Sequence, residues 1–189
     1  MRIIAGSFRS RSLDAPPGLN TRPTSDRLRE TLFNVLAPRI AGAVFLDLYA
    51  GSGAVGIEAL SRGAAHVVLV ERARPALKIL RGNLTRLQIE SGITVSAGSV
   101  PAFLRSAAEP DAGKNGYDLV FLDPPYDAVD EYTSTLELLG GAAGTVLAPG
   151  ALVIAEHRRK TVLKERFGKL QRSRRLEQGD AALSFYTIP

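Results

Sequence analysis

One short stretch, residues 44–53, constrains the fold of this chain most tightly. Its sequence is VFLDLYAGSG, an apolar run that ends in two glycines. A helical pattern, VGIEAL, follows at residues 55–60. Open α/β sheets build a nucleotide-sized site at their carboxyl edge from such a unit of buried strand, glycine-rich turn and helix. The stretch therefore predicts a parallel sheet and marks where a ligand binds to it.

The rest of the chain alternates between apolar runs typical of strands and apolar stripes typical of helices. Strands are expected at residues 44–48, 66–70, 94–97, 117–122, 151–155, 167–176 and 183–188. The pattern predicts an α/β fold with a mainly parallel, seven-stranded sheet, helices on both faces and a C-terminal antiparallel hairpin. Residues 1–20 are typical of a short β-hairpin arm. We expect a single domain over 1–189, with this arm attached to a core over 21–189.

The glycine turn fits two different cofactors. Gly51, Gly53 and Gly56 form a G-x-G-x-x-G pattern, and Glu71 lies twenty residues after the first glycine, as in dinucleotide-binding folds. Asp47 favours the other cofactor, because a carboxylate repels a pyrophosphate but attracts the sulfonium and ammonium groups of S-adenosylmethionine. The D-x-x-x-G-x-G pattern resembles that of class I methyltransferases. S-adenosylmethionine is therefore the expected cofactor, and a nicotinamide dinucleotide is the alternative.

A second motif, DPPY at residues 123–126, follows a strand expected to lie beside the first one. Proline lacks an N–H group, so this turn offers acceptors: the Asp123 carboxylate and the Pro124 carbonyl. Two acceptors suit the two hydrogens of an exocyclic amino group on a nucleobase, and Tyr126 offers a face on which the base can stack. The sequence here resembles the amino-methyltransferases, whose motif is [N/D/S]-P-P-[Y/F/W].

The composition excludes several other chemistries. The chain has no cysteine and only two histidines, so a covalent thiolate route to pyrimidine C5 and a metal site are not expected. No apolar run approaches the roughly 20 residues that span a bilayer, and there is no signal-peptide pattern, so we expect a cytoplasmic protein without a membrane partner. The net charge is +5, and basic residues gather at both ends of the sequence. Such ends are typical of contact with a phosphate backbone.

The flanking sequence is more specific than either motif. MRIIAG at 1–6, RPT at 22–24, RETLFN at 29–34 and DLYAGSG at 47–53 closely resemble the bacterial RsmD family. The resemblance extends from the first residue to about residue 126. It implies a Rossmann-like class I methyltransferase fold with S-adenosylmethionine as the donor. The implied acceptor is N2 of guanine 966 in 16S ribosomal RNA, within the small subunit or an assembly intermediate, and we expect the enzyme to be a monomer.

The motifs and the resemblance together give the candidate site residues. The candidate catalytic residues are Asp123, Pro124 and Tyr126. The candidate cofactor-binding residues are Arg22, Thr24, Asp47, Tyr49, Gly51, Ser52, Gly53, Glu71, Arg72, Ser99, Val100 and Asp123. The candidate RNA-binding residues are Arg9, Arg11, Arg158, Arg159 and Lys160, and no metal ligand is expected. Ser99 departs from the family pattern, because many class I enzymes place an acidic residue there to contact the adenine amine. Its hydroxyl, or the backbone at Val100, is the substitute that the sequence offers.

Three other functions stay open at this point. DPPY also occurs in DNA adenine-N6 methyltransferases, so the motif alone does not choose the base. The glycine pattern leaves a nicotinamide-dependent dehydrogenase as a further alternative. A non-enzymatic RNA-binding assembly factor with a degenerate pocket is the last one, and the intact motifs argue against it.

Overall fold

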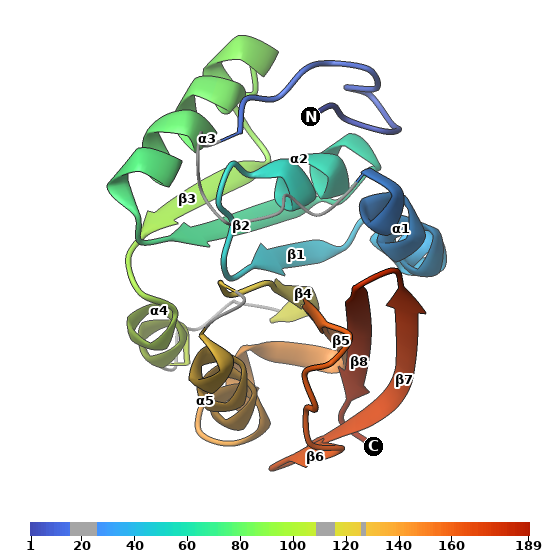
Figure 1. The fold of residues 1–189 in the computed structure, drawn as a ribbon. Coiled ribbons are helices and arrows are strands. Elements are labelled where there is room, and N and C mark those ends of the chain that lie inside the picture. The colour runs from blue at the N-terminus through green and yellow to red at the C-terminus, as the bar shows by residue number, and fades with distance from the viewer. Residues whose placement is uncertain (16–25, 109–115, 126–127) are drawn as a thin grey trace.

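The computed structural model describes residues 1–15, 26–108, 116–125 and 128–189 (Figure 1). Its centre is one sheet of eight strands in the order β3-β2-β1-β4-β5-β8-β7-β6. The strands are β1 Val44–Asp47, β2 His66–Glu71, β3 Ile93–Ala97, β4 Tyr117–Leu122, β5 Leu147–Arg158, β6 Arg166–Phe167, β7 Leu170–Gln178 and β8 Ala181–Thr187. Strands β1 to β5 pair in parallel, and β5, β8, β7 and β6 pair antiparallel. The predicted α/β class and the antiparallel C-terminal hairpin are therefore confirmed.

The sheet has one strand more than the seven expected. The extra strand, β6, overlaps the start of the stretch that the sequence assigned to a single strand over 167–176. Gly168 takes a φ of 55°, in the left-handed region that favours glycine, and turns the chain back there. Phe167 then pairs with Leu170 across this turn. The predicted strand thus contains the last residue of β6, a turn and most of β7.

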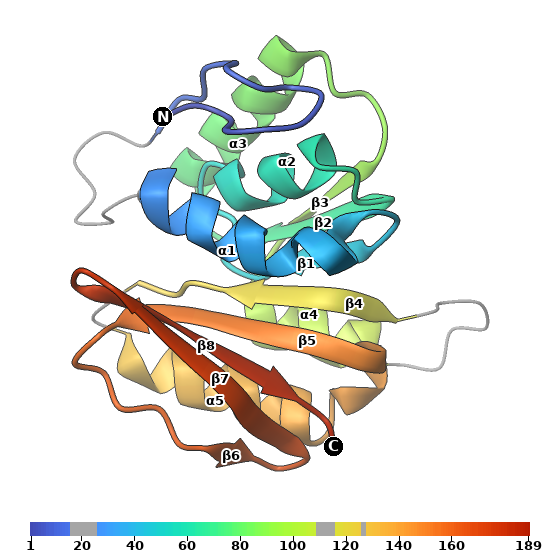
Figure 2. The ribbon, with the colours of Figure 1, turned by 90° about the vertical axis from the view of Figure 1, so that its right-hand side faces the viewer.

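Helices cover both faces of the sheet (Figures 1 and 2). They are α1 Asp26–Ile40, α2 Ala54–Ser61, α3 Arg74–Leu87, α4 Val100–Ala107 and α5 Val129–Gly140, followed by the short 3-10 helix η1 Gly144–Val146. Side chains of α1, α2 and α3 pack with Phe45, Phe121 and Ile154 in one core. Side chains of α4 and α5 pack with Leu46, Leu122 and other residues in a second core on the opposite face. No helix among the described residues is long and apolar enough to cross a membrane.

The N-terminal arm is less regular than the hairpin that the sequence predicts. Its two sides run antiparallel, but the described part, residues 1–15, contains one isolated bridge, between Arg2 and Ser12, and no strands. Two backbone N–H groups of the arm donate to helix α2 instead: the Glu58 carboxylate accepts from Ile4 N and Ala5 N at 2.8 and 3.0 Å. Backbone groups committed to a helix side chain cannot complete a β-ladder, which explains the difference.

The tip of the arm contacts the C-terminal end of α2 closely. Ser61 Oγ accepts from Phe8 N at 3.0 Å and donates to Ala5 O at 2.6 Å. Gly6 has a φ of 84°, and a Cβ atom there would lie 1.7 Å from Ser61 O. Only glycine fits this approach, so the arm is docked in one position against the helix that follows the glycine turn.

Candidate active site

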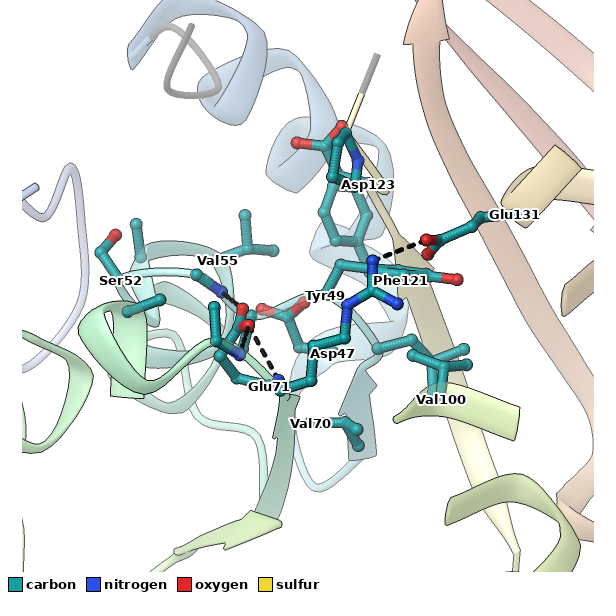
Figure 3. A pocket seen from close by; sticks show the side chains of 18 of the residues that line it. Asp47, Tyr49, Ser52, Val55, Val70, Glu71, Val100, Phe121, Asp123 and Glu131 are labelled. Atoms are coloured by element: carbon teal, nitrogen blue, oxygen red, sulfur yellow. Dashed lines mark hydrogen bonds and ion pairs between the residues drawn. The ribbon is translucent and has the colours of Figure 1, made fainter. Parts of the chain in front are cut away.

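A cavity of about 320 Å³ opens at the carboxyl ends of β1, β2 and β4. The prediction that the strand before DPPY lies beside the first strand is confirmed, because Asp47 of β1 is in register with Phe121 of β4. Figure 3 shows Asp47, Glu71 and Asp123 around this cavity. The candidate residues that line it are Asp47, Tyr49, Gly51, Ser52, Glu71, Arg72, Val100 and Asp123. Two motifs far apart in the sequence thus share one cavity.

The glycine turn has the geometry that its sequence predicts. Gly51 and Gly53 take positive φ values of 53° and 82°, which an L side chain adopts only with strain. The third glycine, Gly56, serves packing: a Cβ atom there would lie 2.2 Å from Leu69 Cδ2 of β2. Helix α2 can therefore approach the sheet closely, and its N-terminus points towards the end of β1.

Asp47 occupies that helix N-terminus with its own carboxylate. The side chain is buried, and its Oδ2 accepts from Gly56 N at 3.2 Å. Its Oδ1 has no hydrogen-bond partner among the described residues. Burial, together with the negative charges of Glu71 and Glu156, raises the pKa of Asp47 to about 7 despite the bond from Gly56. A buried carboxylate oxygen without a donor is suited to a cationic or donor group in the cavity.

Two carboxylates consequently lie at the turn where an anion would bind to this helix. Dinucleotide-binding folds place a pyrophosphate against free N–H groups at the helix N-terminus. Here Gly56 N faces Asp47, and Gly51 N donates to Glu71 Oε2 at 2.8 Å. A pyrophosphate at this turn would meet the two carboxylates, which disfavours the dehydrogenase alternative.

Glu71 is held in one orientation by backbone donors. Its Oε2 accepts from Gly51 N, and its Oε1 accepts from Arg72 N and Ala73 N at 2.8 and 2.7 Å. Each carboxylate oxygen can accept about two hydrogen bonds, so Oε2 can still accept another donor. This arrangement suits a ribose hydroxyl, the group that an acidic residue at this spacing binds in dinucleotide-binding folds.

One wall of the cavity is built by contacts with α5. Tyr49 Oη lies 2.8 Å from Thr135 Oγ1, and burial raises the pKa of Tyr49 to about 12. Arg72 Nη2 donates to Glu131 Oε1 at 2.8 Å, a contact drawn in Figure 3. Glu131 was not a candidate in the sequence, because nothing in a helical pattern marks which acidic residue faces a distant strand.

Asp123 lies directly after β4 and faces the cavity. Its pKa is raised well above the usual value, first by burial, then by Glu156 and then by Asp47. The carbonyl of the buried Pro124 accepts a hydrogen bond from Tyr132 Oη at 3.3 Å. A carbonyl oxygen has two lone pairs, so this bond leaves one acceptor position on Pro124. Tyr126 lies outside the described residues.

The remaining cofactor candidates differ in their positions. Gly53 and Ser99 are not among the residues that line the cavity. Ser99 is the N-cap residue of α4 and makes no side-chain cap bond, while the neighbouring Gly98 and Val100 line the cavity. Arg22 and Thr24 lie outside the described residues. Next to α4, the cavity is thus lined by the residues on either side of Ser99.

Several lining residues were missed by sequence reasoning. They include Met1 and Ala15 of the arm, Arg29 of α1, Val70, Ala73, Ala76, Phe121 and Glu131. Strand alternation could have found Phe121, since it lies two residues before Asp123 and so on the same face. The arm residues carry no such signal, because their place depends on the docking of the arm to α2.

The five candidate RNA-binding residues are all exposed but occupy two separate regions. Arg158, Arg159 and Lys160 lie at the end of β5, which is the carboxyl edge that carries the cavity. Arg9 follows the turn held by Ser61 at the far end of α2, away from the glycine turn. Among the described residues no group of three His, Asp or Glu side chains could hold a metal ion.

Known proteins are similar to this chain over its whole length. The family model described as "Conserved hypothetical protein 95" matches residues 1–187. "Putative rRNA methyltransferase YlbH" of Bacillus subtilis is 37% identical over 186 residues, which cover 98% of each chain. "Ribosomal RNA small subunit methyltransferase D" of Escherichia coli is 41% identical over 149 residues, 78% of this chain and 72% of that protein. A solved structure, "Putative methyltransferase yhhF from Escherichia coli", superposes with a TM-score of 0.83 at 35% identity, covering 100% of this chain and 97% of the other.

Proposed function

The chain belongs to the RsmD family, and from this premise we propose that it transfers a methyl group from S-adenosylmethionine to the exocyclic N2 of a guanine in ribosomal RNA. The specific acceptor that we propose is guanine 966 of 16S ribosomal RNA, in the small subunit or an assembly intermediate. One observation carries the proposal. Asp47, whose buried Oδ1 has no hydrogen-bond partner among the described residues, lines the same cavity as Asp123.

The cavity residues fit this cofactor chemically. When bound, S-adenosylmethionine supplies an electrophilic methyl group on a positively charged sulfur. Asp47 provides the negative charge that a cationic ligand requires, and Glu71 provides an acceptor for ribose hydroxyls. Apolar residues such as Val70, Val100 and Phe121 exclude water from the rest of the cavity.

Asp123 and Pro124 act on the acceptor nitrogen. The lone pair of an exocyclic amine is conjugated into the base, so the amine is a poor nucleophile. The Asp123 carboxylate and the free lone pair of the Pro124 carbonyl would accept the two N–H groups and favour a pyramidal nitrogen. The carboxylate also stabilises the positive charge that develops on this nitrogen, and we assign most of the catalysis to positioning and electrostatics.

The RNA grip that we propose is asymmetric. Arg158, Arg159 and Lys160 lie at the edge that carries the cavity and would contact phosphates next to the target nucleotide. Arg9 and Arg11 would contact a more distant part of the particle. A guanine in folded RNA must leave its stack to reach Asp123. We infer that the enzyme recognises a preformed ribosomal shape, with the base entering between these two basic regions.

Replacement of Asp123 by alanine tests the proposal. We expect Asp123→Ala to reduce methyl transfer to undermethylated small subunits at least about 100-fold, as the loss of a transition-state contact does. Cofactor affinity by calorimetry should stay within about threefold, since Asp47 and Glu71 remain. Glu137→Ala, at an exposed ion pair with Lys164, is the matched control and should keep full activity.

The choice of acceptor is tested on the wild-type protein. Small subunits, naked 16S ribosomal RNA and duplex DNA should be compared as methyl acceptors, and the modified nucleotide mapped. Methylation of guanine 966 at N2 is the expected result. Preferential methylation of duplex DNA, calorimetric binding of NAD without S-adenosylmethionine binding, or full activity of Asp123→Ala would each overturn the proposal.

A further inference from the structure

A third carboxylate lies at the carboxyl edge of the sheet, next to Asp123. In the pairing of β4 with β5, Phe121 is in register with Ile154, and Leu122 with Ala155. The next residues on the two strands are Asp123 and Glu156. Because side chains alternate between faces, both lie on the face of Phe121 and Ile154, which belong to the core under α1. Neighbouring strands are about 4.8 Å apart, so the two carboxyl groups are close neighbours.

Glu156 differs from Asp123 in exposure. It is 1% exposed and is not among the residues that line the cavity, whereas Asp123 is one of them. Glu156 therefore lies behind Asp123 as seen from the cavity. Its position suits action on Asp123 rather than contact with the RNA base.

The charges around Asp123 are mostly negative. Asp47 faces it from β1 and Glu156 from β5, and both raise the pKa of Asp123. Arg29 of α1 also lines the cavity, but its guanidinium is bound to Asp26 and to the carbonyl of Arg2. The other charged residues of the lining, Glu71, Arg72 and Glu131, contact the glycine turn or one another. Among the described residues, no cation contributes to the shift in the pKa of Asp123.

Methyl transfer to an amine creates a need for a base. The nitrogen gives its lone pair to the methyl carbon, the carbon–sulfur bond breaks, and its electron pair goes to the sulfur. The nitrogen then carries a positive charge until one N–H proton leaves. Asp123, already placed against these hydrogens in the proposed function, is the group that can take the proton.

We propose that Glu156 is a positioning residue that keeps Asp123 basic enough to take the proton released from the methylated nitrogen. The inference rests on the proposed function, because it assigns a proton to the same amine. The negative charge of Glu156, one strand away and shielded from water, disfavours the ionised form of Asp123. Asp123 is therefore a stronger proton acceptor. A buried like charge next to a carboxyl group is how proteins produce such a shift.

The pH dependence of methyl transfer tests this role. Glu156→Gln keeps the size of the side chain and removes the charge. We expect the acidic limb of the rate–pH profile to move to lower pH by about one unit, because Asp123 ionises more easily without this neighbour. Asp118→Asn is the matched control: this carboxylate lies at the opposite end of β4, where it accepts from Val44 N. Asp118→Asn should leave the acidic limb in place. If Glu156 had only a structural role, Glu156→Gln would also leave the limb in place.

A second measurement does not depend on activity. Carbon-13 carboxyl signals of the wild-type protein, without RNA or cofactor, should show Asp123 titrating above the ordinary aspartate range, with the signal assigned by its loss in Asp123→Asn. The titration should move to lower pH in Glu156→Gln. An ordinary Asp123 titration in the wild type would overturn the role of Glu156 even if Glu156→Gln failed to fold. An unmoved titration in a folded Glu156→Gln would do the same, whereas absent methyl transfer by the wild type would overturn the proposed function instead.

Discussion

Two buried carboxylates on either side of the glycine turn, Glu58 and Asp47, have opposite surroundings. Glu58, in the middle of α2, accepts from Ile4 N, Ala5 N and Arg62 Nε, the last at 2.7 Å, and Arg29 Nε lies 3.8 Å away. Asp47, at the end of β1, accepts from Gly56 N and keeps one oxygen without a partner among the described residues. Both side chains are almost fully excluded from solvent.

The difference separates a structural carboxylate from the one that we propose binds the cofactor. The charge of Glu58 is neutralised within the protein by two arginines and two backbone donors. Glu58 therefore serves to hold the arm against α2. Asp47 lacks a counterion among the described residues: burial, with the charges of Glu71 and Glu156, raises its pKa to about 7. A buried carboxylate that the fold leaves uncompensated indicates that a ligand supplies the missing charge.

The largest effect is expected from removing the charge of Glu58. Glu58→Gln should lower the free energy of unfolding by about 3–5 kcal/mol, because Arg29, which is fully buried, loses its buried counterion. An amide also places a donor against the donors of the arm. Urea denaturation followed by circular dichroism measures the change. Glu137→Gln, at the exposed pair with Lys164, should change stability by less than about 0.5 kcal/mol, and a similar small effect for Glu58→Gln would refute the structural assignment.

The comparison predicts that removing the charge of Asp47 increases the stability of the protein, whereas removing that of Glu58 decreases it. Below the ordinary aspartate pKa of 3.8, Asp47 is protonated in both the folded and unfolded states, so it contributes nothing. Between 3.8 and about 7 the unfolded chain ionises while the folded protein keeps its proton, so stability falls as the pH rises. Asp47→Asn should therefore stabilise the cofactor-free protein by about 2–4 kcal/mol near pH 8 and hardly at all near pH 4. Thermal unfolding at both pH values provides the test, and destabilisation at pH 8 would contradict the prediction.

A smaller effect sharpens the same comparison through the ligand. If ionised Asp47 holds the cationic cofactor, the dissociation constant of S-adenosylmethionine should rise about tenfold for each pH unit below about 7, or about 1.4 kcal/mol per unit. Above this pH the affinity should level off. Calorimetric titrations between about pH 5.5 and 7 measure the slope. Asp47→Asn is the control, and equal slopes in both proteins would assign the dependence to another group.

The sequence predicted the parts of the fold that depend on local pattern. The strand at 117–122 and the neighbouring positions of the DPPY motif and the glycine turn are confirmed. Helix α1 contains Pro38 and continues to Ile40. Proline removes one helical hydrogen bond, and burial of Ile40 beneath the sheet outweighs that loss. The fifth strand is also longer than predicted, since β8 pairs with it as far as Arg158.

The site was predictable where a motif names the chemistry and unpredictable where partners come from distant segments. The sequence identifies Asp47, Glu71 and Asp123 because each stands at the carboxyl end of a predicted strand. Glu58 and Glu156 are single acidic residues within apolar runs, so the sequence pattern does not indicate their role. Only the docked arm and the register of β4 with β5 show that the first is neutralised and the second lies beside Asp123.

The strand order has a consequence for how the protein is made. β1, β2 and β3, with the arm and the helices α1 to α3, come from the first hundred residues, whereas β4, β5 and the hairpin come from the remainder. Chains emerge from the ribosome from the amino end, and units with mostly local contacts can fold as they emerge. The glycine turn, Asp47 and Glu71 are therefore all synthesised before Asp123 and Glu156. A nascent chain can therefore form the part of the site that we propose binds the methyl donor before it contains the residues that we propose act on the acceptor.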